Sequence, residues 1–408
     1  MVDKIDNKVL IREFNEERDT QVVGKLEKNC EIGSNKGVSF FTNMMGDPLC
    51  RIRLYAAHVM LVAELRENGE LVGVVRGCIK HVGTKFGGKH VKLGCILGLR
   101  VSPNHRRMGI GLSLVKAVEE WMVRNGAQYT FLATEKNNVA STNLFTTKCN
   151  YINFSSLVIF VHPLNLPLRG LKSGDIKIEK LRLDQANSLY YDKLRSKDIY
   201  PADIDSILTE KLSVGTWVSY FKEDEWLDFK SNDDNNNENE NKAKNHEDVI
   251  SKTPRSWIIF SIWNSCEAYK IQIRKSYPLK LIHATLSHAK DIIFPCLKMP
   301  VCGSLENPFG FLFLYGLHGE GEKLGELMQS VLRFASRLAE DVKHCKVIIT
   351  ELGVSDPLIE HVPRESSMSC INDLWYLKCL SGDNHNNDQE QLMRMGQLGN
   401  VFVDPRDF

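Results

Sequence analysis

Two arginines and two glycines stand directly before an apolar run with helical spacing. They are Arg106, Arg107, Gly109 and Gly111 in the stretch VSPNHRRMGIGLSLVKAVEEW, residues 101–121. The first turn of a helix leaves backbone N–H groups unpaired, and the helix dipole adds partial positive charge at the same place. Glycine lets a ligand approach the backbone closely and permits positive φ angles. The stretch therefore predicts a binding site for a pyrophosphate or a similar dianion.

Two familiar phosphate-binding motifs do not describe this stretch. The sequence contains no GxxxxGK[ST] loop. A dinucleotide-binding turn requires GxGxxG, whereas Gly109 and Gly111 have no third glycine at the required spacing. The pattern that does fit is Arg or Gln, then x-x-Gly-x-Gly or Ala, after a strand and V-x-P.

The turn needs a strand before it and a helix after it. The apolar run LGCILGLRV precedes it, and a second apolar run, QYTFLAT, follows the helix. A hairpin, HVMLVAEL and LVGVVRGCIKHV around RENGE, comes earlier; a short helix, NNVASTNLFTTKC, and a strand, YINFSSLVIF, come later. This order predicts an α/β sheet with a right-handed crossover. The main helix should end near Gly126 and bury one face, formed by Ile110, Leu114, Val115, Val118, Trp121 and Met122.

The 408 residues are long enough for more than one domain. We predict a first domain over residues 1–165, a linker over 166–174 and a second domain over 175–381. Residues 230–248, KSNDDNNNENENKAKNHED, are almost without apolar groups, which predicts a disordered insertion. Residues 382–408 are predicted to form a mobile tail.

The second domain repeats the order of the first. The stretch that begins PFGFLFLYGLHGEGEKLGELMQS again reads as an apolar strand, a glycine turn, a helix and a strand. Aligning the expected helix starts pairs Glu322 with Arg106, Gly325 with Gly109 and Leu327 with Gly111. Because glutamates replace the cations, we expect a degenerate copy of the fold that does not bind the dianion.

Residues 95–121 resemble the coenzyme A signature of the GCN5-related N-acetyltransferases (GNAT). That resemblance implies a mixed, splayed central sheet flanked by helices, with acetyl-coenzyme A as cosubstrate. It also implies that the amides of the turn hold the pyrophosphate and that the preceding strand pairs with the pantetheine arm. The motif N-x-x-S-x-x-L-F resembles the next helix of that family, whose asparagine contacts the cofactor; the same asparagine is also a good N-cap. The cofactor-binding residues implied are Leu99, Arg100, Val101, Arg106, Arg107, Met108, Gly109, Ile110, Gly111 and Asn138.

A longer resemblance covers nearly the whole chain. The segments FTNMMGDPLCRIR, CILGLRVSPNHRRMGIG, SWIIFSIWN, YGLHGEGEK and VFVDPRDF are similar to plant Hookless-type probable N-acetyltransferases. That family pairs an acetyltransferase-like N-terminal domain with a second domain and is associated with hormone-linked differential growth. The resemblance implies a role in plant growth and an intracellular location, in the nucleus or the cytoplasm, with the nucleus preferred.

Acetyl transfer to an amine requires a base that removes a proton from the amine. Glu135 follows the run YTFLAT, so it is expected near the cofactor opening. The alternative is that Glu135 is a solvated or helix-capping residue. Glu31 and Glu64 are weaker candidates, and His105 is expected beside the phosphates rather than the thioester.

The departing thiolate often takes a proton from a tyrosine in this family. Phe145 stands at that position here and cannot donate a proton. Tyr151 lies six residues further on and is the candidate acid, although it could equally be a packing residue. The thiolate could also leave unassisted, since a thiol of pKa about 8.5 is a fair leaving group.

Composition excludes several other classes of function. The formal net charge is +1, so no global attraction to nucleic acid or membranes is expected. The 11 cysteines show no CxxC spacing, which predicts reduced thiols in an intracellular protein and no metal site. The N-terminus lacks a secretory pattern, and no run of 18 apolar residues occurs, so no membrane span is expected.

Two functions remain open at this point. The first is an N-acetyltransferase that moves an acetyl group from acetyl-coenzyme A to a protein lysine or a small amine. The second is a non-catalytic acyl-coenzyme A-binding regulator that acts through protein contacts. Phe145 and the degenerate second domain favour the regulator, whereas the intact turn favours at least cofactor binding.

Overall fold

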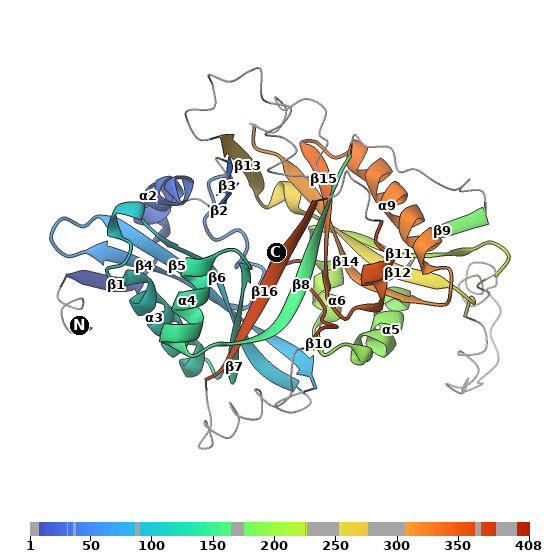
Figure 1. Cartoon of the computed structure of the whole chain (residues 1–408), viewed down its shortest axis with the longest axis horizontal. Coiled ribbons are helices and arrows are strands. Elements are labelled where there is room, and N and C mark those ends of the chain that lie inside the picture. The colour runs from blue at the N-terminus through green and yellow to red at the C-terminus, as the bar shows by residue number, and fades with distance from the viewer. Residues whose placement is uncertain are drawn as a thin grey trace, which may run out of the picture.

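One large mixed sheet runs through the whole protein (Figure 1). The computed structural model describes residues 8–30, 32–35, 38–85, 90–164, 175–224, 226, 253–275, 307–363, 369–380 and 398–408. The predicted linker at 166–174 and the predicted insertion at 230–248 lie outside these described residues.

The sheet has an N-terminal half and a C-terminal half, joined at its centre. Its strands, in spatial order, are β1 (Val9–Glu13), β4 (Ala57–Leu65), β5 (Leu71–Thr84), β6 (His90–Val101), β7 (Tyr129–Glu135), β16 (Ser369–Cys379), β8 (Ile152–Pro163), β15 (Cys345–Gly353), β14 (Gly310–Glu320), β12 (Trp257–Asn264), β11 (Ser213–Phe221) and β9 (Ile176–Lys180). The short strand β10 (Ile199–Pro201) pairs with β5. A separate small sheet contains β2 (Ile32–Asn35), β3 (Val38–Asn43) and β13 (Lys270–Lys275).

The two halves repeat one strand pattern and exchange their last strands. Each half contains a pair of parallel strands, β6 with β7 and β14 with β15, and in each pair the two strands are connected along the chain by a helix. The strand that follows β7 along the chain is β8, yet β8 pairs with β15 and β16. In turn β16, the last strand of the C-terminal half, pairs with β7. Figure 1 shows β8 and β16 crossing the centre between the two halves.

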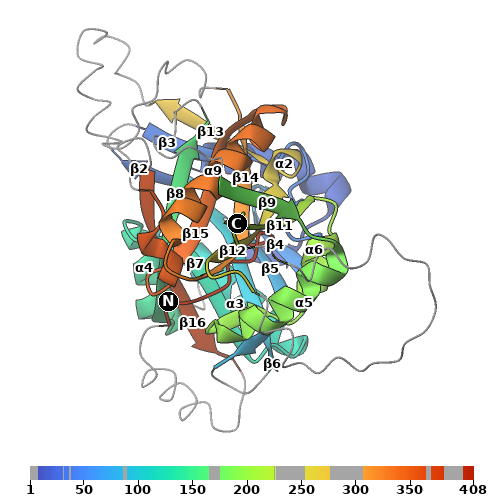
Figure 2. The same ribbon diagram turned by 90° about the vertical axis from the view of Figure 1, so that its right-hand side faces the viewer.

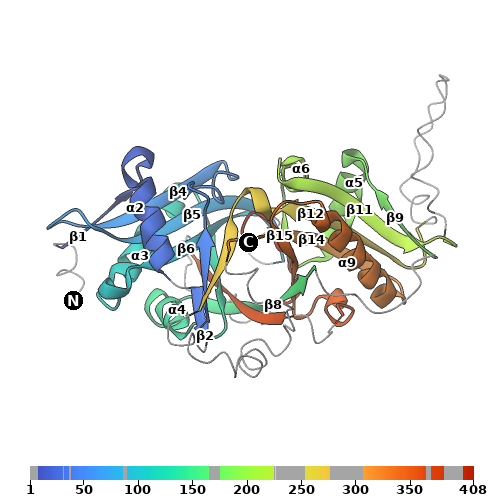
Figure 3. The same ribbon diagram turned by 90° about the horizontal axis from the view of Figure 1, so that it is seen from above.

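Two helices cover opposite faces of the N-terminal half (Figure 3). Helix α2 (Glu16–Asn29) begins after Asn15, whose side chain accepts the Arg18 N–H. Helix α3 (Ile110–Arg124) packs closely because glycines lie beneath it: a Cβ at Gly77 would sit 2.5 Å from a Val118 methyl carbon. The short α4 (Val139–Asn143) continues as a π-helical segment over Leu144–Lys148.

The C-terminal half is covered in the same way. Helix α9 (Leu324–Glu340) lies on one face, and α5 (Leu183–Lys193) and α6 (Ile204–Thr209) lie on the other (Figure 2). The predicted fold class is therefore confirmed: a mixed α/β sheet with flanking helices and a second, degenerate copy of the same unit. In the parts of the chain that the structure describes, no helix is long and apolar enough to span a bilayer.

The predicted mobile tail, residues 382–408, is only partly described. Residues 398–408 are packed in the structure, so the prediction is wrong for them; residues 382–397 lie outside the described residues. The segment enters the centre of the molecule, where Phe402 is 5% exposed and its N–H donates to the Ile199 carbonyl. Arg406 forms ion pairs with Asp404 and Asp203. Apolar VFV and aromatic Phe408 bury surface that a polar tail would not, which explains why the segment is ordered.

One face of the sheet meets this segment, and we call it the central face. It carries Phe131, Ala133 and Glu135 on β7, Asp373 and Trp375 on β16, and Ile349 and Glu351 on β15, because alternate residues of a strand share a face. Phe131, Trp375, Ile349 and Phe402 belong to one apolar core. Helices α3 and α4 cover the opposite face of β7 and β16.

The buried position of Phe402 can be tested by truncating its side chain. Phe402→Ala should lower the free energy of unfolding by about 3–5 kcal/mol, because it leaves a cavity in the central core. Urea denaturation would measure the loss, with Leu183→Ala as the control, since Leu183 is 45% exposed. Equal stability of Phe402→Ala and wild type would show that the segment is not packed as described.

Candidate functional site

Strands β6 and β7 separate after a short paired stretch. They pair only from Leu93 with Tyr129 to Cys95 with Phe131. Beyond this point β6 stays bonded to β5, and β7 stays bonded to β16 as far as Glu135. The two strands therefore turn backbone edges toward each other that no described strand covers. Residues 97–101 of β6 are half-exposed along this opening.

A bulge in β6 accompanies the separation. Three residues of β5, from Val74 to Arg76, lie opposite four residues of β6, from Leu97 to Arg100. Gly98 lies in the bulge with φ +58°, and a Cβ there would be 2.7 Å from Arg76 Nη1. A bulge bends and twists its strand, so it directs β6 away from β7. Sequence reasoning missed it, although a glycine inside an apolar strand is the usual signal.

The turn that follows β6 exposes backbone amides. Gly109, with φ +86°, is the N-cap of α3, and the Ser113 N–H makes the first helical hydrogen bond, 3.0 Å to the Gly109 carbonyl. The amides of Ile110, Gly111 and Leu112 therefore have no helical carbonyl to reach. Arg107 is also left-handed, with φ +64°, which is unusual for a residue with a side chain.

Packing does not explain why residue 111 is glycine. A Cβ at Gly111 would meet only the Leu144 Cδ2 atom at 3.6 Å and the Val101 Cγ2 atom at 3.7 Å, both ordinary contacts. The protein itself thus leaves room for a side chain at this position. A glycine at this position leaves the amides of the turn open to close approach by a ligand.

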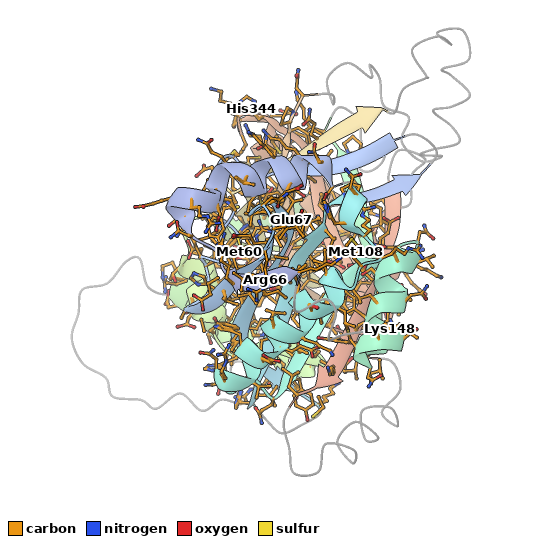
Figure 4. All side chains as sticks on the ribbon, turned by 90° about the vertical axis from the view of Figure 1, so that its left-hand side faces the viewer. Met60, Arg66, Glu67, Met108, Lys148 and His344 are labelled. Atoms are coloured by element: carbon orange, nitrogen blue, oxygen red, sulfur yellow. The ribbon has the colours of Figure 1, made fainter. Side chains whose placement is uncertain are left out.

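The cationic side chains lie at the mouth of the opening. Arg106 and Arg107 are exposed, and Arg106 Nε donates 3.3 Å to the Val101 carbonyl. Met108, 44% exposed, marks this turn in Figure 4, which also labels Lys148 at the end of the π-helical segment. The predicted turn residues are therefore brought together with the half-exposed Leu99, Arg100 and Val101 at one end of β6.

Asn138 caps the next helix. Its Oδ1 atom accepts the Ser141 N–H at 3.1 Å, and the residue is exposed. Local capping thus explains Asn138 by itself, and its contact with a cofactor stays a prediction.

Glu135, the predicted base, ends β7 and faces another carboxyl. Asp373 on β16 is its direct cross-strand partner. Burial, with Glu135 adding negative charge, raises the pKa of Asp373 to about 7. Sequence reasoning missed Asp373, because it lies more than 230 residues further along the chain.

The weaker base candidates are not at this place. Glu64 is tied to Arg12 and Arg18, each 2.7 Å away, and hydrogen bonding to Arg12 lowers the pKa of Glu64. Glu31 lies outside the described residues. The His105 ring lies 3.4 Å from the Ser102 hydroxyl, in the turn.

The structure corrects the prediction for Tyr151. Its hydroxyl donates 2.8 Å to Glu119 on α3, and its ring packs edge-on against Phe145. Tyr151 is 3% exposed, and burial together with Glu119 raises its pKa well above the usual value. It therefore fills the core beneath α3, the packing alternative, and does not reach the opening.

Another tyrosine lies closer to the opening. Tyr376 on β16 pairs with Leu132, the first residue of β7 beyond its paired stretch with β6. Its hydroxyl is 3.4 Å from the Thr142 hydroxyl on α4. No local signal could have found this residue, because it comes from the C-terminal half.

The equivalent turn of the C-terminal half is filled by the chain itself. Helix α9 begins at Leu324, so Gly325 matches Gly111 and Glu320 matches Arg106; the sequence alignment was shifted by two residues. A Cβ at Gly321 would lie 2.2 Å from the Arg255 carbonyl oxygen, and the Lys323 N–H donates to the Ser256 hydroxyl. The chain's own backbone therefore occupies the turn at Gly321, and a glutamate stands where the other half has Arg106.

Among the residues that the structure describes, one group of side chains has the spacing to hold a metal ion. Ligand atoms of Cys78, Cys95 and Asp407 lie within 4.8 Å of one another. The Asp407 carboxylate, however, already accepts the Tyr55 hydroxyl at 2.5 Å and forms an ion pair with Lys80. These contacts satisfy the carboxylate without a metal, so the group is a buried polar cluster.

The raised pKa of Asp373 predicts how stability depends on pH. An unfolded aspartate ionises near 3.8, whereas the folded one keeps its proton up to about pH 7. The unfolded state therefore holds fewer protons between these values, and wild-type stability should fall as pH rises through this window. Asp373→Asn removes this titration. The thermal unfolding midpoint of the variant minus that of wild type should therefore increase from pH 4 to pH 7 and then level off. A constant or shrinking difference would show that the folded carboxyl is already ionised.

Comparisons with known proteins agree with this geometry. Residues 35–151 match the model of the acetyltransferase (GNAT) family. The chain is 36% identical to the probable N-acetyltransferase HLS1 of Arabidopsis thaliana over 413 residues, covering 98% of this chain and all of that protein. It is 34% identical to the HLS1-like probable N-acetyltransferase of the same plant over 421 residues, covering 98% and 99%.

A solved structure shares the fold. An N-myristoyltransferase of Saccharomyces cerevisiae with bound myristoyl-CoA and inhibitors superposes with a TM-score of 0.52 and 10% identity, over 91% of this chain and 80% of that one. At this identity the likeness concerns the fold alone. The chain shares 34–36% identity with these relatives over nearly its full length, and it matches the family model. It therefore belongs to the HLS1-type probable N-acetyltransferases of the GNAT family.

Proposed function

We propose that this N-acetyltransferase moves the acetyl group of acetyl-coenzyme A to the side-chain amine of a protein lysine, in the regulation of plant growth. The observation that carries the proposal is the turn after β6. Its bare amides and two exposed arginines adjoin a pair of strands that separate. A pyrophosphate at the turn and an extended arm between the strands match the shape of coenzyme A.

Each part of the opening has a distinct task in this proposal. The amides of Ile110, Gly111 and Leu112 hold the pyrophosphate, and Arg106 and Arg107 neutralise its charge. The free edge of β6 at residues 97–101 offers its main chain to the pantetheine arm. A backbone N–H on the facing edge would stabilise the oxygen of the thioester as charge develops there.

The acceptor side of the opening is acidic, which favours an amine. Glu135 and Asp373 lie together at the end of β7. A lysine side chain carries a positive charge at neutral pH, so carboxylates attract it and then receive its proton. A small cationic amine would meet the same groups and is the alternative acceptor.

The resemblance to relatives in plants supports a proposal for the cellular setting. We place the protein inside the cell, in the nucleus, with the cytoplasm as the alternative. A lysine acceptor on a nuclear protein would connect the activity with growth control. Comparison of acetylated lysines in plants with and without the protein would identify acceptors, and no change at any site would count against this role.

Cofactor binding can be tested at Gly111. Gly111→Glu should weaken acetyl-coenzyme A binding about 100-fold or more, because the new side chain covers the amides and repels the pyrophosphate. Gly325→Glu is the matched control at the same helix position of the other half, where no binding is expected. Calorimetry on both variants would measure the affinities; equal binding by Gly111→Glu and wild type would refute the site.

Turnover distinguishes the enzyme from the regulator. Release of coenzyme A should occur with at least one amine among histone-tail peptides, other lysine peptides and spermidine. Binding of acetyl-coenzyme A without release across all of these amines would instead support the non-catalytic regulator.

A further inference from the structure

Strand β16 brings residues of the C-terminal half to the opening. It occupies the position beside β7 that the next strand along the chain, β8, would otherwise take. Its residues alternate between the two faces of the sheet: Asp373 and Trp375 lie on the central face, and Leu374 and Tyr376 lie beneath α3 and α4. The second half therefore contributes side chains to a site that it cannot form in its own turn.

Three carboxyl groups lie together on the central face. Glu135 and Asp373 are direct cross-strand partners, so their Cβ atoms lie about 4.5–5.5 Å apart. Asp373 is 9% exposed, and Glu351 on β15 is 6% exposed. The negative charges of Asp373 and Asp407 both act on Glu351.

Two buried polar atoms in this cluster have no hydrogen-bond partner. Glu351 Oε1 and Trp375 Nε1 are both enclosed and unpaired. The Trp375 indole N–H lies toward Glu351 without completing a hydrogen bond. An unpaired buried polar group costs free energy, so these two atoms lower the local stability of the cluster.

The protonation of the cluster suits proton transfer near neutral pH. Burial, with the nearby charge of Asp373, raises the pKa of Glu351 well above its usual value. Asp373, whose pKa is raised to about 7, changes charge at neutral pH. A base is most effective when it titrates near the working pH, and an ordinary surface aspartate would not.

We propose that Asp373 is the general base that removes the proton from the acceptor amine, with Glu135 beside it guiding the ammonium group into place. The inference rests on the proposed function, since it assigns a residue to that reaction. The base is thus supplied by the C-terminal half, across the exchanged strand, to a cofactor held by the N-terminal half.

The ammonium group gives one proton to the Asp373 carboxylate, and the freed amine nitrogen attacks the carbonyl carbon of the thioester. The C–N bond forms, the C–S bond breaks, and the second proton of the nitrogen passes to the departing thiolate. Asp373 then releases its proton to solvent, leaving the N-acetyl amine and coenzyme A thiol.

Other charged groups face this cluster and affect its titration. Glu135 comes from β7, and Glu351 comes from β15. From the C-terminal segment Asp407 adds negative charge near Glu351, and Lys80 on β5 pairs with Asp407. The pH profile therefore belongs to the cluster as a whole.

The test compares Asp373→Asn with wild type and with Asp341→Asn, an exposed carboxyl at the end of α9. Acetyl-coenzyme A and the most active amine of the panel are the substrates. Asp373→Asn should lower kcat by about 100-fold or more while its affinity for acetyl-coenzyme A stays unchanged. Wild type and Asp341→Asn should show a rise in kcat through pH 7, and Asp373→Asn should lose that rise.

Asp373→Glu keeps the carboxyl and should recover part of the rate, which a purely structural role would not predict. If Asp373→Asn has the same kcat and the same pH profile as wild type, the inference is overturned and the proposed function stays intact. Acetyl-coenzyme A binding without turnover by wild type would overturn the proposed function, and the inference with it.

Discussion

The site depends on hydrogen bonding of the β7 backbone. A buried strand cannot leave its neighbour unless its backbone groups find other partners. Strand β7 can turn away from β6 because β16 bonds to its other edge along its full length. On the other side, β5 holds β6 through the bulge at Gly98. The opening thus forms while β6 and β7 each keep a bonded neighbour on the other side.

In this arrangement the C-terminal half has a structural role although its own turn is blocked. Its own turn is blocked by Arg255 and Ser256, and it has glutamate where the other half has Arg106. Its contribution is β16, which supports β7 and carries Asp373, Trp375 and Tyr376 to the centre. Loss of one ligand site is therefore compatible with retention of the fold around it.

Local signals in the sequence were enough for several elements of the N-terminal half. The hairpin β4–β5, strand β6, the glycine turn, helix α3 and strand β7 each follow from periodicity, capping and turn residues. The centre could not be derived in this way. The pairing of Asp373 with Glu135, the exchange of β8 and β16, and the burial of residues 398–408 all join segments that are distant in the chain. Tyr151 illustrates the same limit, because only the packing around Glu119 shows which way its ring points.

Strand exchange also has a consequence for how the chain folds. When the first half leaves the ribosome, β7 and β8 have no strand between them until residues 369–379 have been made. The edges of β7 and β8 that later bind β16 stay unpaired with it while about 200 further residues are synthesised. Unpaired edges of this kind can pair with strands of other chains. The long sequence separation of these contacts also slows folding. Expression of the two halves as separate chains would leave these edges of β7 and β8 without β16.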